Sequence, residues 1–202
     1  MELELRDDTY APSSREEAIE WFPEVNDIQN DRLRETTIGV IQQFPNYFWM
    51  APAASRHHPP EHRIRHGLVL HTKRVCTAFE RTAESMVQQN HLSWDEVDMG
   101  RAACICHDGM KYGSPPTSTE STVYNHDTIM GEWLEKNTQM PEEVVGAVEA
   151  HNGSWYKGKS PETHLEQMVH VADMHASDEN VRIAVKEMND VLREQFPRVS
   201  ER

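Results

Sequence analysis

Apolar residues in this chain recur at helical spacing, and nowhere do they alternate over a stretch long enough to demand a β-strand. Two helix starts have the form of a capping box, in which a hydroxyl and a carboxylate satisfy first-turn amides reciprocally: Ser14 with Glu17, and Ser93 with Glu96. These signals predict an all-α fold, a bundle in which several helices bury their apolar faces against one another.

Expected helices follow one another along most of the chain. The pattern predicts helices that begin at the two capping boxes and helices over 27–44, 61–89 (one long helix or two abutting ones), 125–135, 141–149 and 161–196, the last broken near 177–179. The helix that opens at Ser93 becomes increasingly apolar toward His107, so its end should be buried. Residues 111–122, rich in Gly, Ser, Thr and Pro, should form an irregular loop after His107 and Asp108.

A chain of 202 residues fits one compact domain, here divided into an N-terminal helical extension over 1–60 and a main domain over 61–196. Asp and Glu outnumber Lys and Arg by 34 to 20, which gives a formal charge of -14. Such a charge disfavours an extended nucleic-acid groove, because phosphate binding relies on Lys and Arg. Small anionic substrates stay open, and salt adaptation is an alternative reason for the acidity.

Three cysteines, Cys76, Cys104 and Cys106, form an odd set without a disulfide framework, and we expect the last two to be buried packing residues. The N-terminus lacks a basic region followed by an apolar run, and no membrane-spanning apolar stretch occurs. We therefore expect a cytoplasmic protein that does not enter a membrane. The sequence leaves open whether it forms a homo-oligomer.

Twelve histidines are present, and some of them fall at ends of the expected helices beside acidic residues. Six positions stand out along successive helices: His71, His107, Asp108, His126, His151 and Asp173. A bundle could bring them together in an interior metal site. Imidazole and carboxylate ligands suit Mn, Fe, Co, Ni, Zn or Mg, and a carboxylate can bridge two such ions in a phosphate-ester hydrolase.

The segments around these positions resemble the HD-domain phosphohydrolases, named for consecutive His-Asp ligands, and most closely the HD domain of bacterial 3′-5′ exoribonucleases. The resemblance covers about Glu61 to Val185. It is carried by His66-Gly67-Leu68-Val69-Leu70-His71-Thr72, Cys106-His107-Asp108-Gly109-Met110-Lys111, Asn125-His126-Asp127-Thr128-Ile129-Met130-Gly131, Glu149-Ala150-His151-Asn152-Gly153, Ser160-Pro161-Glu162 and His170-Val171-Ala172-Asp173.

This resemblance implies a helical HD domain in which His71, His107, Asp108 and Asp173 hold one divalent metal ion. It implies that His126 and His151 could hold a second ion, with Asp108 as the bridge. Catalysis would then depend on Asp108 and on Lys111 beside the substrate phosphate, with a metal-bound hydroxide as the nucleophile. One or two ions, of uncertain identity, would be the cofactors.

The sequence departs from the family pattern at several points, including Gly109-Met110 after Asp108, where an apolar residue followed by Gly is commoner. His66 stands where the family often has the first of two glycines, which reduces backbone freedom at that point. Asn152 stands where the family often has a second histidine, which bears on the second metal. Residues 1–60 do not resemble a nucleic-acid-binding barrel, so the exonuclease activity does not follow from the resemblance alone.

Further residues have two interpretations each. His170 precedes Asp173 by one helical turn and is a candidate to hydrogen-bond the metal site. Tyr112, Trp155 and Lys157 are candidates for substrate contact, or ordinary loop residues. The cluster of His57, His58 and His62 next to Pro59-Pro60 is expected to be an exposed loop without a role in the site.

The sequence therefore predicts an enzyme that hydrolyses a phosphate ester or anhydride in a small, nucleotide-like substrate. Two alternatives stay open: 3′-5′ trimming of short single strands, and a noncatalytic bundle that senses a metal or a nucleotide. The acidity, the short chain and the missing nucleic-acid module favour the small substrate.

Overall fold

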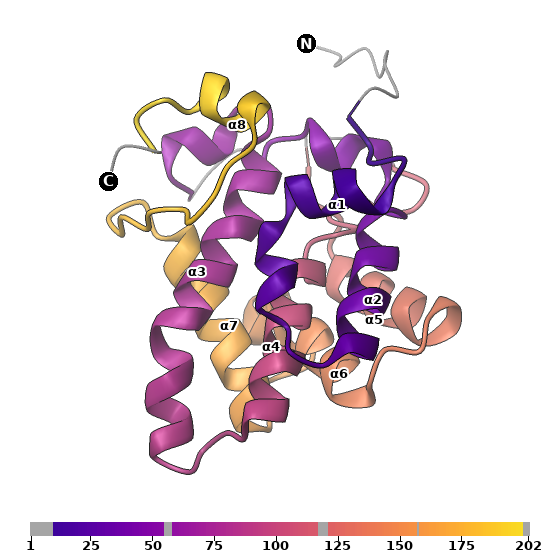
Figure 1. The fold of residues 1–202 in the computed structure, drawn as a ribbon, viewed down its shortest axis with the longest axis vertical. Helices are drawn as coiled ribbons and strands as arrows, with labels where there is room; N and C mark the ends of the chain where they lie inside the picture. Colours follow the sequence, from indigo (N-terminus) through magenta and orange to yellow (C-terminus); the bar gives the residue numbers. More distant parts are fainter. Residues whose placement is uncertain (1–9, 55–57, 117–120, 157, 200–202) are drawn as a thin grey trace.

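The computed structural model describes residues 10–54, 58–116, 121–156 and 158–199 (Figure 1). Within these residues the α-helices are α1 (Arg15–Trp21), α2 (Asp31–Ile41), α3 (Gly67–Gln88), α4 (Trp94–Cys106), α5 (His126–Asn137), α6 (Glu142–Ala150), α7 (His164–Ser177) and α8 (Asp190–Gln195). Short 3-10 turns lie at η1 (Pro23–Asp27), η2 (Asn46–Trp49), η3 (Pro60–Arg63) and η4 (Gly153–Tyr156). The described part contains no strand beyond one isolated bridge, so the all-α prediction is confirmed.

The two expected capping boxes differ in completeness. At α4, the Glu96 amide donates to Ser93 Oγ (3.2 Å) and the Glu96 carboxylate accepts the Ser93 amide (2.7 Å), so the box is complete. At α1, Ser14 Oγ accepts the Glu17 amide, but the Glu17 carboxylate accepts the amide of Ser13 instead of Ser14. Both helices still begin where the sequence predicts.

The helix expected over 27–44 is shorter in the structure, because its first residues are held by a side chain from another helix. The Asp98 carboxylate of α4 accepts the backbone amides of Gln29 (2.9 Å) and Asn30 (2.8 Å). Asn30 then caps α2 by accepting the Leu33 amide at 3.0 Å. These two contacts fix the start of α2 at Asp31 and tie the N-terminal residues to α4.

The last predicted helix, over 161–196, is wrong over residues 178–189, between α7 and α8. The expected break near 177–179 is where α7 ends, but the chain then runs without helix until α8 begins at Asp190. Apolar side chains in this segment, such as Ile183, Val185 and Met188, are buried in the core. Ile183 and Val185 are two residues apart and would not share one face of a helix, so burial of a non-helical segment accounts for their pattern.

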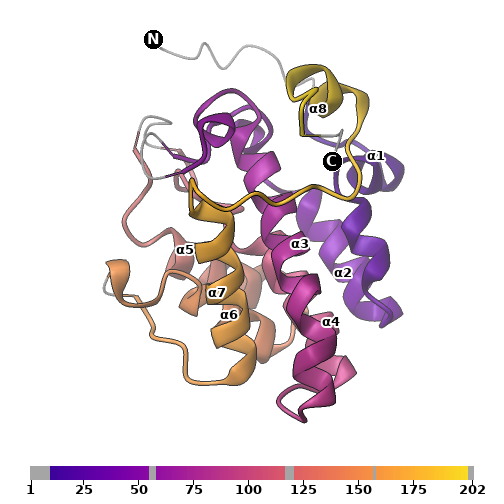
Figure 2. The same ribbon diagram turned by 90° about the vertical axis from the view of Figure 1, so that its left-hand side faces the viewer.

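Helix α4 lies at the centre of the bundle and contacts α2, α3, α6 and α7, as the two views in Figures 1 and 2 show. Its last turns carry small and apolar residues that are nearly inaccessible to solvent, with Ala102 through Cys106 at most 1% exposed. A helix that is apolar on every side must be buried on every side. The predicted burial of this helix end is confirmed, and it carries His107 into the interior.

All three cysteines are buried and unpaired, as expected for packing residues. Burial raises the pKa of the Cys106 thiol to about 12, and it raises the pKa of Cys104 well above its ordinary value. A thiol held neutral in this way is a poor metal ligand or nucleophile.

Residues of the predicted N-terminal extension share one hydrophobic cluster with the rest of the described chain, including Phe22, Phe44, Phe48 and Trp49. The buried Tyr47 hydroxyl donates to the Gly113 carbonyl (3.0 Å) and accepts the Tyr112 amide (3.2 Å). This hydroxyl therefore anchors the start of the loop that follows His107 and Asp108.

The start of α3 packs tightly against η3 at Gly67. A Cβ atom at Gly67 would lie 2.2 Å from the His62 carbonyl oxygen, a distance that no real contact allows. The preceding His66 has a left-handed backbone (φ 61°), the conformation that glycine adopts without strain. Its amide donates to Met50 O and its ring contacts Trp49 O, so these contacts hold His66 where the family often has glycine.

We expect Gly67→Ala to lower the free energy of unfolding by about 1–3 kcal/mol, because the added methyl group must displace the backbone of η3. Urea unfolding of the two proteins measures the difference. Gly39→Ala is the matched control, since a Cβ there meets nothing within 4 Å and alanine favours a helix. Equal stability of Gly67→Ala and wild type would contradict the close contact.

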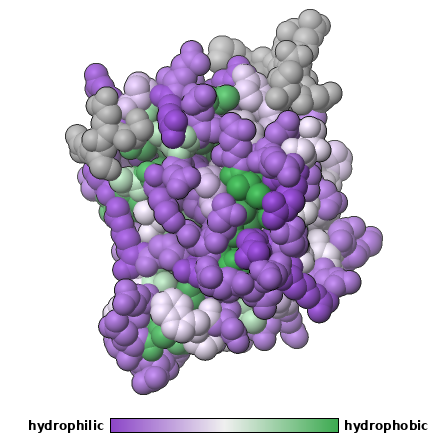
Figure 3. Space-filling view, viewed as in Figure 1, coloured by the Kyte–Doolittle hydropathy of each residue, from purple (hydrophilic) through white to green (hydrophobic). Residues whose placement is uncertain are grey.

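Hydrophilic side chains dominate the face drawn in Figure 3, with hydrophobic residues visible only in narrow strips between them. Among the side chains that the structure describes, the large apolar residues that stay exposed are Ile64, Trp94 and Tyr124. Among the described helices, none combines the length and the hydropathy that crossing a membrane requires.

Candidate metal centre

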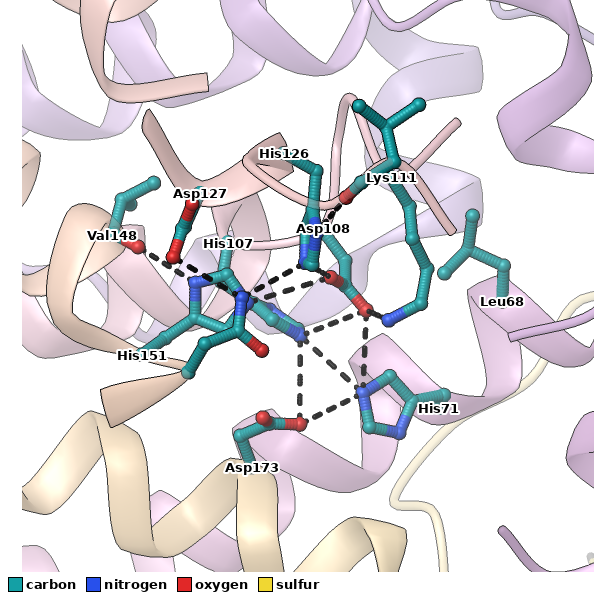
Figure 4. Close-up of polar contacts among 12 residues, drawn as sticks. Leu68, His71, His107, Asp108, Lys111, His126, Asp127, Val148, His151 and Asp173 are labelled. Atoms are coloured by element: carbon teal, nitrogen blue, oxygen red, sulfur yellow. Dashed lines mark hydrogen bonds and ion pairs between the residues drawn. The ribbon is translucent and has the colours of Figure 1, made fainter. Parts of the chain in front are cut away.

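Five helices bring the six predicted ligands together (Figure 4). His71 projects from α3 and Asp173 from α7, while His107 and His151 follow the last residues of α4 and α6, and His126 opens α5; Asp108 comes directly after His107. Each of these side chains is buried, with an exposed fraction of 6% at Asp173 and at most 1% at the others.

The Asp108 carboxylate occupies the middle of the cluster, and its two oxygens face different pairs of histidines. Oδ2 lies 3.5 Å from His71 Nε2 and 3.4 Å from His107 Nε2. Oδ1 lies 3.1 Å from His126 Nε2 and 3.6 Å from His151 Nε2. One carboxylate therefore joins two groups of three residues that could each hold a metal ion.

Asp173 completes one of the two groups. Its Oδ1 lies 3.0 Å from His71 Nε2 and 3.9 Å from His107 Nε2. Asp173 thus adds a second carboxylate beside the group of His71, His107 and Asp108. Among the contacts of the described residues, no second carboxylate lies beside the group of His126, His151 and Asp108. The two halves of the cluster differ in charge.

Three of the histidines are oriented in the same way by the backbone. The Nδ1 atoms of His107, His126 and His151 contact the carbonyl oxygens of Cys104 (2.8 Å), Val123 (2.9 Å) and Val148 (2.6 Å), each three residues earlier. A carbonyl oxygen only accepts, so the proton of the neutral ring sits on Nδ1. The Nε2 lone pair then points toward Asp108, which is the tautomer that metal ligation needs.

The donor atoms of the cluster fit a cation better than they fit one another. Asp108 Oδ1 is buried and accepts no hydrogen bond, although His126 Nε2 lies 3.1 Å away. Two lone pairs that face each other without a proton leave a buried acceptor unsatisfied, which costs free energy. A divalent ion between them would satisfy both, so the buried His and Asp residues could hold metal.

Charges inside the cluster shift several pKa values. Burial opposes ionisation of Asp108, but the Lys111 ammonium and the His107 ring hold the pKa of that carboxyl well below its usual range. Burial also lowers the pKa of His126 in spite of the Asp108 carboxylate. At His151, burial acts in the same direction, but the attraction of the neighbouring Asp108 carboxylate outweighs it and the pKa is raised.

Lys111 lies beside the cluster and donates to Asp108 Oδ2. The turn that follows α4 places it there, since the Lys111 amide donates to the Asp108 carbonyl at 3.1 Å. Its side chain is 9% exposed against 1% for Asp108, so the lysine is the less deeply buried member of the pair. A cation in this position can meet an anionic group that approaches the cluster.

Asn152 contacts the same histidine that faces Asp108 Oδ1. Its Nδ2 donates to His126 Nε2 at 3.1 Å and lies 3.4 Å from Asp127 Oδ2. The Asn152 side-chain amide thus occupies the lone pair of His126 Nε2, which a metal ion in this half of the cluster would need. Asn152 therefore affects one half of the cluster only, the half with fewer carboxylates.

Other predicted contact residues lie at the edge of the cluster or outside it. His170 Nδ1 contacts the His151 carbonyl at 2.7 Å, so it meets the site through the backbone of a predicted ligand. Tyr112 is 1% exposed and its hydroxyl donates to the Pro52 carbonyl at 2.6 Å, which makes it a packing residue here. The side chain of Trp155 and the whole of Lys157 fall outside the described residues.

The expectation of an exposed histidine loop before α3 is wrong for two of its three residues. His62 is fully buried and His58 is partly buried, and their ring centroids lie 5.3 Å and 5.1 Å from that of His71. His57 lies outside the described residues. The two neighbouring prolines do indicate a turn, but η3 folds back over the first predicted ligand instead of facing solvent.

The buried histidines should make the metal-free protein sensitive to acid. Burial lowers the pKa of His58 to about 3 and holds the pKa of His62 well below its usual value, whereas the unfolded chain titrates near 6.5. Between these values the unfolded state binds more protons, so the free energy of unfolding falls as the pH falls below about 6.5. Each fully affected histidine contributes about 1.4 kcal/mol per pH unit.

Urea unfolding of the metal-free protein at pH 8, 6 and 5 measures this slope. His151, whose pKa is raised, acts in the opposite direction and stabilises the folded protein as the pH falls. Asp108, whose pKa is lowered, also stabilises the folded protein, and this stabilisation is lost only at a pH below the ordinary range of a carboxyl group. His58→Phe removes one of the groups and should flatten the curve. Stability that stays constant or rises from pH 6 to pH 5 would contradict neutral burial of these rings.

Comparison of the chain with protein-family models, with curated proteins and with solved structures finds no match in any of the three.

Proposed function

We propose that this chain is a metal-dependent phosphohydrolase of the HD-domain superfamily that acts on a small, nucleotide-like phosphate ester or anhydride. The observation that carries the proposal is the position of Asp108, whose two carboxylate oxygens face two separate pairs of buried histidines. A bridging carboxylate between imidazole groups is the ligand arrangement of two-metal hydrolytic sites.

The ligands divide between two ions in this proposal. His71, His107, Asp108 and Asp173 would hold the first, and Asp108, His126 and His151 would hold the second. Mixed nitrogen and oxygen donors suit Mn, Fe, Co, Ni, Zn or Mg. Bound ions of this kind polarise a phosphoryl oxygen and lower the pKa of water, which are the two things phosphate hydrolysis requires.

Lys111 supplies the remaining positive charge at the substrate side. Its ammonium donates to Asp108, and the Lys111 side chain as a whole is 9% exposed against 1% for Asp108. A phosphate that approaches the cluster therefore meets a lysine held in place by a buried partner. Preorganised charge of this kind stabilises the negative charge that develops on a phosphoryl group during transfer.

The small substrate is favoured by two properties of the chain. Its formal charge of -14 repels a long polyanion, since the basic residues that release counterions are outnumbered. The predicted ligands are also nearly closed off from solvent, with exposed fractions no higher than 6%. A single phosphate group reaches such ligands more readily than a phosphodiester inside a folded or double-stranded polymer.

The test is hydrolysis by protein purified without chelator, after its metal content has been measured. Mn, Co, Ni and Mg are offered with a panel of nucleotides, a generic phosphodiester and an end-labelled oligonucleotide. We expect metal-dependent release of phosphate or nucleoside from the small substrates. Stepwise shortening of the oligonucleotide would replace the proposal with 3′-5′ trimming, and bound metal without turnover of anything in the panel would favour a sensor.

A further inference from the structure

His71 is oriented differently from the other three predicted histidine ligands. The rings of His107, His126 and His151 are each fixed by a backbone carbonyl at Nδ1. The Nδ1 of His71 is buried and has no hydrogen-bond partner in the described part of the chain. Something other than the backbone must therefore hold this ring with Nε2 toward Asp108 and Asp173.

Two imidazole rings pack on that ring from outside the cluster. The His58 ring lies 5.1 Å from the His71 ring at 56°, and the His62 ring lies 5.3 Å from it at 74°. His58 and His62 also contact each other at 5.9 Å. Tilted and edge-to-face contacts at this distance are the favourable geometries of aromatic pairs. His71 is thus confined by two rings from residues that precede α3.

Each of the two outer rings is itself held by a polar partner. Arg74 Nη1 lies 2.8 Å from His62 Nε2, and Arg74 Nη2 donates to Glu61 Oε1 at 2.7 Å. Because arginine only donates, His62 Nε2 accepts, and this neutral ring has one fixed tautomer. Arg74 is 4% exposed and stands one turn after His71 on α3.

His58 is held from the opposite side, through the second ligand of the same half. Its Nε2 lies 3.2 Å from Ser177 Oγ, and Ser177 Oγ donates to Asp173 Oδ1 at 3.4 Å. A single side chain, His58, thus packs on the ring of His71 and is joined through one hydroxyl to the carboxylate of Asp173. His71 and Asp173 are predicted ligands of the same ion. Neither side chain is fixed by a local backbone contact of the kind that holds the other three histidine ligands.

We infer that His58 and His62 are positioning residues for the metal ion held by His71, His107, Asp108 and Asp173, and that His58 with Ser177 sets the affinity of this half of the centre. The inference rests on the metal centre proposed above, but not on hydrolysis. Outer partners that orient a ligand change metal affinity by about 10–100-fold when they are removed. The half formed by His126 and His151 should not depend on them.

The experiment is titration of chelator-treated protein with Mn²⁺ and with Co²⁺, in which the free ion is measured directly and substrate is absent. We expect His58→Ala to weaken one class of binding site by about 10–100-fold and to leave the other unchanged. His58→Phe keeps a ring against His71 and should recover most of the lost affinity. His175→Ala, at an exposed histidine on α7, is the matched control and should bind like wild type.

Thermal unfolding of the metal-free variants separates loss of affinity from loss of fold. Should His58→Ala fail to fold, Ser177→Ala decides, because it removes one hydroxyl at a partly buried position and should still weaken the same class of site. Wild-type affinity in both variants would overturn the inference. Unchanged affinity with lost hydrolysis in His58→Ala would also overturn it, because His58 would then act on the substrate.

The two proposals fail in different ways. A wild-type protein that binds the ions but hydrolyses nothing refutes the proposed function and leaves the positioning role intact. A protein that hydrolyses substrate with full dependence on metal, but whose affinity ignores His58 and Ser177, refutes only the positioning role. Absence of any binding of Mn, Fe, Co, Ni, Zn or Mg by the wild type, measured in the same titration, refutes both.

Discussion

Replacement of Asp108 by asparagine is expected to abolish hydrolysis and to weaken the binding of both metal ions. The carboxylate is the one side chain that faces all four predicted histidine ligands. Its loss removes a negative ligand from each ion at once, so affinity should fall by more than about 100-fold. In the proposed function the ions would supply several kcal/mol of stabilisation to the transition state, so the rate should fall by about 10³-fold or more.

Phosphate release and Mn²⁺ titration on the same preparation measure the two effects of Asp108→Asn. Asp98→Asn is the matched control: this buried carboxylate holds the amides of Gln29 and Asn30 and the side chain of Arg101, away from the cluster. It should lower stability and leave metal affinity unchanged. Full activity in Asp108→Asn would refute the proposed function outright.

Replacement of Lys111 by alanine is expected to separate catalysis from metal binding. The ammonium contacts Asp108 and repels any cation placed beside it, so its removal should raise affinity for Mn²⁺ by about tenfold. Under the proposed function, the same removal takes away the charge that would face the substrate phosphate. Hydrolysis should therefore slow by about 10²–10³-fold, even when the centre is fully loaded.

Titration with Mn²⁺ and the rate at saturating Mn²⁺ test these opposite changes in Lys111→Ala. Lys136→Ala is the control, since this lysine lies in the last turn of α5 and is exposed. A fall in metal affinity would show that Lys111 supports the centre structurally. An unchanged rate would mean that this lysine does not act on the substrate, the behaviour expected of a noncatalytic sensor.

The all-α fold was predictable because its main signals are local. The capping box at Ser93 and Glu96 and the apolar run that follows it depend only on residues within one helix, and α4 begins and becomes buried as predicted. The start of α2 was not predictable in this way. It depends on the Asp98 carboxylate, which reaches two backbone amides far away in the sequence.

The candidate site was predictable where its residues lie at the ends of predicted helices. His107, His126 and His151 lie at such ends, and their residue types together with their order along the chain are enough to indicate a metal site. His58 and His62 could not be placed, because the neighbouring prolines indicate a turn but not the surface on which the turn packs. The close approach of Gly67 to the His62 carbonyl determines where the turn packs, and a glycine in the sequence does not by itself indicate such an approach.

The contact of Tyr47 with the loop after Asp108 has a consequence for the smallest unit that could keep this site. A fragment that began at residue 61 would lose the hydroxyl that both accepts the Tyr112 amide and donates to the Gly113 carbonyl. It would lose the Pro52 carbonyl that accepts the Tyr112 hydroxyl as well. A fragment meant to keep the His and Asp cluster together with the loop that follows it should therefore retain Tyr47 and Pro52, upstream of α3.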